Sequence, residues 1–264
     1  VSGIRDLSQK RNTSLDQSGD KVKVDVGGSI LDVEVDGPSG APAILHFNGA
    51  GRTLRQWDIV LPRLTDSFRS IRLDMRGVGQ STPAADPSQY SFHQFVDDAS
   101  KVLDAVGVEK CHIWSMAWGS RVGLAFSATN PDRVISATLN DISTDPADPD
   151  AQREGHVKAM KLQAAAGVEP FESPAGAGEH AYPDQVPLAI AANHSGSFDL
   201  KAAIPDLTMP VLIVTGDCDP NIVSSRNMAE AAPSARLVEL KNVGHGSILQ
   251  RPDLTTDLFL QFQS

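Results

Sequence analysis

A histidine and an aspartate in the C-terminal part of the chain have the surroundings of a catalytic base. His245 lies between two glycines in the segment Asn242-Val-Gly-His-Gly, and Asp219 comes shortly after the apolar run 211–214. An aspartate at the end of a buried strand can accept a hydrogen bond from an imidazole and fix the tautomer whose other nitrogen accepts a proton. We therefore predict that Asp219 orients His245 as the base of a nucleophilic reaction.

The nucleophile for such a base is expected at a sharp turn between a strand and a helix, and this position holds an alanine. Residues 115–119 read Ser-Met-Ala-Trp-Gly, which fits the pattern small-x-nucleophile-x-glycine with Ala117 as the nucleophile position. The residues two before and two after it must be small, because the strand and helix backbones approach each other there. Ser115 and Gly119 are small, whereas taking Ser115 as the nucleophile would require the β-branched Ile113 at the first of these positions. An alanine methyl group cannot attack a carbonyl carbon.

A glycine-rich loop could stabilise the negative charge that develops on a reacting carbonyl oxygen. Residues 45–52 read Leu-His-Phe-Asn-Gly-Ala-Gly-Arg and follow an apolar strand pattern. Main-chain N–H groups of such a loop, together with the N–H of the residue after the nucleophile, form an oxyanion hole. We assign these donors to Ala50 or Gly49, and to Trp118.

Four motifs in this order, spread over residues 43–255, resemble those of the α/β-hydrolase superfamily. Residues 131–134, Pro-Asp-Arg-Val, lie 14 residues after Ala117, where the family's nucleophile helix ends. The resemblance implies an α/β fold in which a mostly parallel central sheet has helices on both faces and a small helical lid. It also implies nucleophilic attack on an acyl carbon, a covalent intermediate, and hydrolysis by a water molecule that the histidine activates.

A turn at residues 73–81, Leu-Asp-Met-Arg-Gly-Val-Gly-Gln-Ser, also matches a pattern frequent in that family. The pattern is a structural signature, so we assign no chemistry to Asp74 or Arg76.

A second carboxylate competes with Asp219 for the role of triad acid. Asp141 follows the strand after the nucleophile helix, 24 residues beyond Ala117. Some hydrolases, including lactonases that resemble this chain, take their acid from the end of that strand. Asp219 occupies the more common place and is preferred, and Asp141 stays open as the alternative.

The remaining sequence predicts the elements that would position these residues. Alternating polar and apolar residues at 21–26 and 30–35 indicate a hairpin. Short apolar runs separated by helical stretches indicate a parallel sheet that is buried on both faces. The runs are 43–47, 70–74, 111–114, 135–139, 211–214 and 237–240, and the helical stretches include 91–106, 117–129 and a closing helix at 248–262. We expect one core formed by residues 21–144 and 206–264, after a loose leader at 1–20.

The alternation of strands and helices stops between residues 145 and 205. Two helices are expected there, at about 149–166 and 185–194, joined by a stretch at 168–182 that is rich in proline, glycine, alanine and glutamate. An insertion of about 60 residues between two sheet strands, at the end of the sheet where ligands bind, is most simply a lid.

Comparison with the reactions of the resembled family favours an ester or lactone. Trp118 after the nucleophile position is typical of haloalkane dehalogenases and epoxide hydrolases. Epoxide hydrolases need two lid tyrosines, however, and this lid offers Tyr182 alone, while Trp57 and Trp114, which could help to bind a halide, precede the lid. C–C bond hydrolases usually carry tryptophan directly after the catalytic histidine, where this chain has Gly246. By elimination, an ester or lactone hydrolase is favoured, with haloalkane dehalogenase-like and C–C hydrolase activities as alternatives. The loop Asn48-Gly-Ala-Gly, with no histidine before the glycine, resembles that of enol-lactonases and resorcylic-lactone hydrolases.

The alanine at position 117 has two interpretations. A serine replaced by alanine would leave base, acid and oxyanion donors in place, as they are here. Natural loss of chemistry would be expected to erode His245 and Asp219 as well, so we prefer a Ser→Ala inactive variant. A natural, non-catalytic binder of small molecules is the alternative.

Composition limits the possible partners and location. A net charge of −10 over 264 residues, with no dense cluster of Lys and Arg, argues against nucleic acid. No apolar run reaches the length of a membrane span. Cys111 and Cys218 are expected to be free thiols in a reducing compartment, hence a cytoplasmic location. We expect a small-molecule ester or lactone as the partner, and neither a metal nor a cofactor.

Overall fold

The computed structural model describes residues 19–191 and 198–264. Of the expected leader, residues 1–18 therefore lie outside the described residues, and Asp20 already belongs to the first strand. Residues 192–194 of the second expected lid helix also lie outside them.

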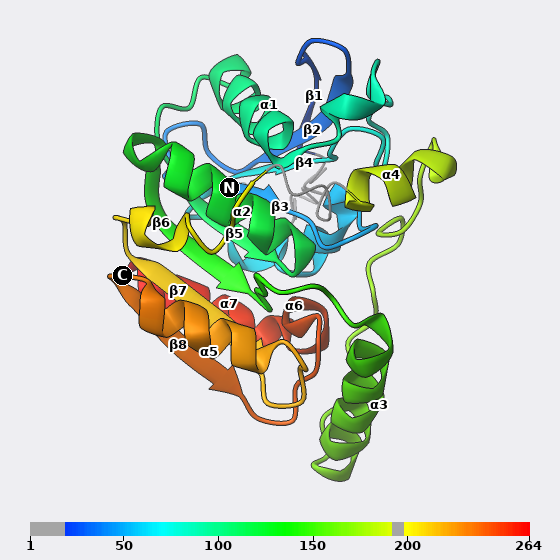
Figure 1. Ribbon diagram of the computed structural model, residues 1–264, viewed down its shortest axis with the longest axis vertical. Helices are drawn as coiled ribbons and strands as arrows, with labels where there is room; N and C mark the ends of the chain where they lie inside the picture. The colour runs from blue at the N-terminus through cyan, green and yellow to red at the C-terminus, as the bar shows by residue number, and fades with distance from the viewer. Residues whose placement is uncertain (1–18, 192–197) are drawn as a thin grey trace, which may run out of the picture.

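An eight-stranded, mostly parallel sheet forms the centre of the molecule, as predicted (Figure 1). Its strand order is β1-β2-β4-β3-β5-β6-β7-β8. The predicted hairpin is formed by β1 and β2, which are antiparallel; β2 also pairs antiparallel with β4, and every later pairing is parallel. The strands are β1 (Asp20–Asp25), β2 (Ile30–Asp36), β3 (Ala43–Phe47), β4 (Arg69–Leu73), β5 (Cys111–Met116), β6 (Val134–Asn140), β7 (Val211–Gly216) and β8 (Ala235–Leu240).

Helices cover both faces of this sheet. In Figure 1, α1 (Phe92–Ala105), α2 (Trp118–Thr129) and α5 (Ile222–Ala231) lie on the near face, and α7 (Pro252–Gln263) lies on the far face. The start of α1 is fixed by Ser91, whose hydroxyl accepts a hydrogen bond from the N–H of Gln94. Short 3₁₀ helices connect the larger elements: η1 (Leu54–Ile59), η2 (Leu61–Arg63), η3 (Pro87–Gln89), η4 (Pro131–Arg133), η5 (Pro183–Gln185) and η7 (Ile204–Asp206).

The prediction of one closing helix at 248–262 is wrong. The segment forms a short helix, α6 (Ser247–Gln250), followed after Arg251 by α7. Proline at position 252 has no N–H to continue the hydrogen bonds of α6 and disfavours helical backbone in the residue before it. The break at Arg251 comes six residues after His245.

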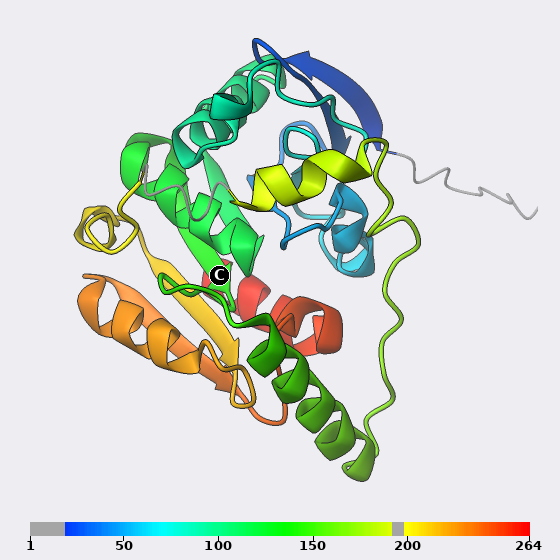
Figure 2. The ribbon, with the colours of Figure 1, turned by 45° about the vertical axis from the view of Figure 1, so that its right-hand side comes forward.

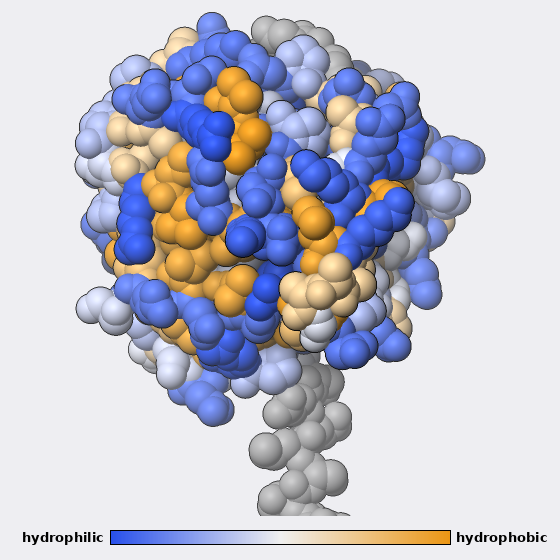
Figure 3. Space-filling view, turned by 90° about the horizontal axis from the view of Figure 1, so that it is seen from below, coloured by the Kyte–Doolittle hydropathy of each residue, from blue (hydrophilic) through white to orange (hydrophobic). Residues whose placement is uncertain are grey.

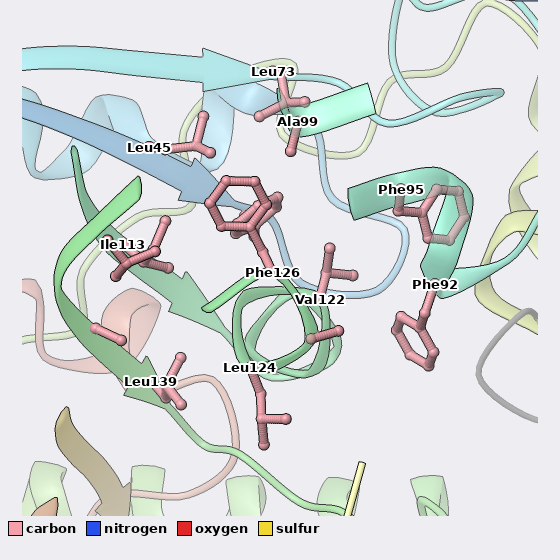
Figure 4. Packing of buried hydrophobic residues seen from close by; sticks show 14 of the residues in the cluster. Leu45, Leu73, Phe92, Phe95, Ala99, Ile113, Val122, Leu124, Phe126 and Leu139 are labelled. Atoms are coloured by element: carbon pink, nitrogen blue, oxygen red, sulfur yellow. The ribbon is translucent and has the colours of Figure 1, made fainter. Parts of the chain in front are cut away.

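The core between the sheet and the near-face helices fixes the position of α2. Side chains from β3, β4, β5 and β6 meet side chains from α1 and α2 (Figure 4). Leu45, Ile113 and Leu139 from the strands, with Val122 and Phe126 from α2, are all fully buried. Each such side chain contributes roughly 1.5–3 kcal/mol by leaving water. The helix that begins directly after Ala117 is therefore held firmly against the sheet.

A segment between β6 and β7 extends beyond this core. It contains α3 (Pro149–Ala165), which agrees with the expected helix at 149–166, and α4 (Val186–Ala191), which agrees with the described part of the second. Asp148 caps α3 by accepting hydrogen bonds from the N–H groups of Asp150 and Ala151. Figures 1 and 2 show α3 projecting away from the sheet and a long stretch of chain returning from its far end to α4.

The turn after β4 is held by buried charges. Arg76 makes a bidentate ion pair with Asp98, with donor–acceptor distances of 2.5 and 2.7 Å, and both side chains are fully buried. Asp74 accepts hydrogen bonds from the N–H groups of Leu54 (2.6 Å) and Gln80 (2.9 Å). These contacts hold the turn in place.

The exterior mixes hydrophilic and hydrophobic residues on the face seen from below (Figure 3). On α3, Val157 is 51% exposed and Leu162 is 38% exposed. Cys111 and Cys218 are free thiols, as predicted. Among the residues that the structure describes, no helix combines the length and apolar character that crossing a bilayer requires.

At its first turn, α2 approaches the end of β3 too closely for a side chain. A Cβ atom on Gly119 would overlap the main-chain oxygens of Phe47 and Asn48. Backbone atoms cannot move aside without shifting the strand, so only glycine fits here.

We predict that Gly119→Ala lowers the free energy of unfolding by about 1–3 kcal/mol, because the added methyl group forces α2 and β3 apart. Urea denaturation followed by circular dichroism measures the change. The matched control is Gly40→Ala, where no atom lies within 4 Å of the new Cβ. Equal unfolding midpoints for the two variants would contradict the close approach.

Candidate active site

Ala117 lies at a strained turn between β5 and α2, as its sequence pattern predicts. Its φ of 54° and ψ of −115° differ from the ordinary conformations of a residue with a side chain. Its N–H donates to the carbonyl oxygen of Asn140 at 2.8 Å, which ties the turn to the end of β6. The methyl group of Ala117 lines a cavity at the carboxyl ends of the parallel strands. A side chain with a nucleophilic atom at this position would therefore face the cavity.

Ser115 has a different environment. It is fully buried, and its hydroxyl donates to the hydroxyl of Ser120 (3.1 Å) and approaches the carbonyl oxygen of Thr138 (3.3 Å). It is not among the residues that line the cavity. Ser115 packs instead against Gly123 of α2. A Cβ on Gly123 would be only 3.0 Å from the Ser115 hydroxyl, so small residues at both positions let α2 lie close to β5.

His245 and Asp219 come together at the edge of the same cavity. The Nδ1 atom of His245 lies 3.0 Å from Oδ2 of Asp219, and Asp219 is 2% exposed. The other carboxylate oxygen accepts the N–H of Asn221 at 2.9 Å, so the carboxylate has a fixed orientation. With a proton on Nδ1 shared with Asp219, the Nε2 atom is the one that can accept a proton.

The loop that carries His245 is held from its neighbour α6. Gly246 has a φ of 88°, a conformation that glycine adopts without strain. The amide of Gln250 donates to the carbonyl oxygen of His245 at 2.7 Å, and its oxygen accepts the N–H of Gly244 at 3.0 Å. Gln250, the last residue of α6, thus holds the histidine loop through hydrogen bonds to the main chain of both Gly244 and His245.

The protonation of His245 reflects opposing effects. Burial lowers the pKa of His245, but the hydrogen bond and negative charge of Asp219, together with the charge of Asp141, raise it. The raising effects prevail, so the pKa of His245 lies above its ordinary value. Asp219 therefore stabilises the positive charge that the imidazole would acquire as a base.

Asp141 faces Ser247 and not the imidazole. Its Oδ2 atom accepts the N–H (2.8 Å) and the hydroxyl (2.9 Å) of Ser247, the first residue of α6. Its Oδ1 atom is buried without a hydrogen-bond partner in the described structure. Burial, followed by the charge of Asp219, raises the pKa of Asp141 to about 7, although the charge of His245 and the two bonds from Ser247 lower it. The structure therefore brings Asp219, and not Asp141, into hydrogen-bond contact with the histidine.

Of the candidate oxyanion donors, Gly49 already has a partner. Its N–H donates to the side-chain oxygen of Gln56 at 3.0 Å. Trp118 is the first residue of α2, so its N–H has no acceptor within the helix. Ala50 and Trp118 both line the cavity next to Ala117, which favours these two as the donors.

The cavity has a volume of about 680 Å³, within the usual range for sites that bind small organic molecules. One wall comes from the core, including Ala50, Ala117, Trp118 and His245. The other comes from the segment expected to be a lid, through Ala147, Pro149, Gln152, His156, Met160, Phe171, Ser173 and Ile190. The core and the inserted segment thus line the cavity together.

Sequence reasoning missed several polar residues of this cavity. Arg52, Arg121 and His156 line it, and none was singled out. Arg121 lies four residues after Ala117 on α2, and this one-turn spacing was the available signal. Within the described ranges, no cluster of three or more His, Cys, Asp or Glu side chains has an arrangement that could hold a metal ion.

Comparisons with known proteins agree with this architecture. A family model described as alpha/beta hydrolase fold matches residues 42–181. A putative carbamate hydrolase, RutD, from Pseudomonas savastanoi pv. phaseolicola is 28% identical over 235 residues, covering 80% of this chain and 90% of that protein. The rhodomycin D methylesterase DauP from a Streptomyces strain is 28% identical over 258 residues, covering 79% and 86% of the two chains.

A solved structure has the same fold at lower sequence identity. The crystal structure of the enol-lactonase from Burkholderia xenovorans LB400 superposes with a TM-score of 0.73 at 24% identity, covering 92% of this chain and 99% of that one. The family model spans more than half of the chain, from β3 through the strained turn at Ala117 into the inserted segment. The chain therefore belongs to the alpha/beta hydrolase fold family.

Proposed function

We propose that this site binds a carboxylic ester or lactone of a small organic molecule, and that Ala117 occupies the place of a serine that would cleave it. The observation that carries the proposal is the meeting of three features at one cavity. These are the strained turn that presents residue 117, the His245–Asp219 pair, and the N–H groups next to them.

Each group has a role in the reaction of the serine form. The serine hydroxyl at position 117 attacks the acyl carbon while Nε2 of His245 takes its proton. Asp219 holds the imidazole and stabilises its positive charge. The N–H groups of Ala50 and Trp118 donate to the oxyanion of the tetrahedral intermediate. His245 then protonates the leaving alcohol and activates the water that releases the acid.

A substrate with an acyl carbon is favoured over the epoxides and haloalkanes that other enzymes of this fold cleave. Tyr182 is 41% exposed and is not among the cavity residues, so it cannot protonate an epoxide there in the described arrangement. The indole N–H groups of Trp57 and Trp114 donate to Asn48 (2.8 Å) and Asn140 (3.0 Å), so neither is available to a halide. The names of the relatives, a methylesterase, a carbamate hydrolase and a lactonase, also denote cleavage at an acyl carbon.

Residues 145–205 act as the lid in this proposal, in keeping with their contribution to one wall of the cavity. A natural binder of the same fold is the competing interpretation of Ala117. It would use the same cavity but would gain nothing from a base. The two interpretations therefore differ in what happens when a hydroxyl group is supplied at position 117.

We predict that Ala117→Ser creates hydrolase activity on p-nitrophenyl esters or simple lactones, because base, acid and oxyanion donors are already in place. Loss of a nucleophile typically removes on the order of 10⁶ in kcat, so the serine form should far exceed the alanine form. Release of p-nitrophenol, or proton release from lactones, measures the rate.

The control for this prediction is the double variant Ala117→Ser with His245→Ala, which should lose the new activity. A serine form that stays inactive on esters, lactones and thioesters would favour the natural binder. Activity of Ala117→Asp on haloalkanes would instead identify a dehalogenase-like enzyme.

The choice of acid gives a second prediction in the Ala117→Ser background. We expect Asp219→Asn to lower kcat by about 10³- to 10⁴-fold, since it removes the carboxylate that stabilises the imidazolium. It also removes the main effect that raises the pKa of His245, so the rise of kcat/KM with pH should move to lower pH. A pH–rate profile measures both changes.

Asp141→Asn is the matched comparison, because asparagine tolerates the positive φ of 53° at this position. It should shift the profile in the same direction but less, and should leave most of kcat. A larger loss with Asp141→Asn than with Asp219→Asn would make Asp141 the acid.

A further inference from the structure

Among the residues that the structure describes, Arg121 differs from the other buried arginines in having no ion pair with a carboxylate. Its side chain is only 6% exposed, yet in the described part of the chain its guanidinium makes a single hydrogen bond, from Nη2 to the main-chain oxygen of Asp145 at 2.5 Å. The carboxylate of Asp145 is turned to Lys201, 2.6 Å away. Arg121 therefore keeps most of its N–H donors free.

The contrast with Arg72 and Arg76 shows how this protein otherwise treats a buried guanidinium. Arg72 pairs with Asp36 at 2.6 Å and with Glu34 at 2.9 Å, and Arg76 pairs with Asp98. Burying a charge is unfavourable unless a partner compensates for its lost hydration. Arg121 has no carboxylate within ion-pair distance in the described protein; burial lowers its pKa, and the charge of Asp145 offsets only part of this effect. What distinguishes it is its place on the wall of the active-site cavity.

The charge of the cavity is opposite to that of the whole molecule. The chain carries a net charge of −10, whereas the cavity wall includes Arg121 and Arg52. The acidic residue on the same wall is Asp141, whose pKa is raised to about 7 and which bonds to Ser247. A cavity with two guanidinium groups in an acidic protein is suited to an anion.

We infer that the substrate carries a carboxylate in addition to its ester or lactone bond, and that Arg121 binds this carboxylate. This inference rests on the proposed function. A guanidinium matches a carboxylate in a planar, two-point contact that an ammonium group cannot make. Because Arg121 lies four residues after Ala117, its side chain and residue 117 lie on the same side of α2, so one ligand can reach both. Met160, Phe171 and Leu249 give the rest of the cavity an apolar character suited to the carbon skeleton.

The unmutated chain tests the inference by binding, since Ala117 cannot cleave the ligand. Two probes differ in one charge, monomethyl glutarate and dimethyl glutarate, and titration calorimetry measures their affinities. The monoester should bind about 10- to 100-fold more tightly, the range expected for hydrogen bonds to a charged group. Equal affinities, or no binding of the monoester at millimolar concentration, overturn the inference.

Variants assign the preference to Arg121. Arg121→Met should remove the preference for the monoester, and Arg121→Lys, which keeps the charge without the planar fork, should retain part of it. Arg236→Met is the matched control, because Arg236 is exposed on β8 and should leave the preference intact. Persistence of the preference in Arg121→Met overturns the inference. Circular dichroism establishes that each variant is folded, and if Arg121→Met is not, the lysine variant and the two probes on the unmutated chain decide.

Hydrolysis by Ala117→Ser separates this inference from the proposed function. Equal kcat/KM for p-nitrophenyl esters with and without a terminal carboxylate would uphold the hydrolase and overturn the carboxylate subsite. An inactive serine form, combined with binding of the monoester that depends on Arg121, would uphold the subsite and overturn the hydrolase.

Discussion

The first turn of α2 passes so close to the end of β3 that the backbone touches at Gly119, and the geometry of the site depends on this approach. It forces the chain to turn sharply at Ala117, which accounts for the positive φ there. It also brings the free N–H groups at the start of α2 next to the loop that contains Ala50. The core beneath, through Val122 and Phe126, holds α2 in this position. The proposed nucleophile position and the proposed oxyanion donors thus both depend on one packing contact.

Two buried carboxylates close to one histidine have different environments, and this difference separates their roles. Asp219 reaches Nδ1 of His245 and shares its proton. Asp141 is compensated by two donors of Ser247, retains an unpartnered oxygen, and has its pKa raised to about 7. Two like charges in a buried site repel, so one of the pair takes up a proton more readily. Asp219 is thus the carboxylate that holds the imidazole.

Much of the fold was predictable because its signals are local. The strands at 43–47 and 211–214, and the turn at Ala117 with its small neighbours, follow from short-range patterns. The break between α6 and α7 was missed, although Pro252 itself signals it. The contacts of Asp141 were not predictable, since they depend on Ser247, 106 residues away. That Arg121 meets a main-chain oxygen and, within the described ranges, no carboxylate likewise results from tertiary packing, which no local pattern encodes.

The backbone at position 117 bears on why an alanine is found there. A residue other than glycine in such a conformation costs of order 1–3 kcal/mol, and it persists where the side chain has a use. Glycine would adopt a φ of 54° with less strain, and a molecule that only binds its ligand would lose nothing by having it. A Cβ atom at this position, with His245 and Asp219 intact beside the same cavity, instead suits a site built to present a nucleophile. The strain therefore supports the proposal that a serine belongs in this place.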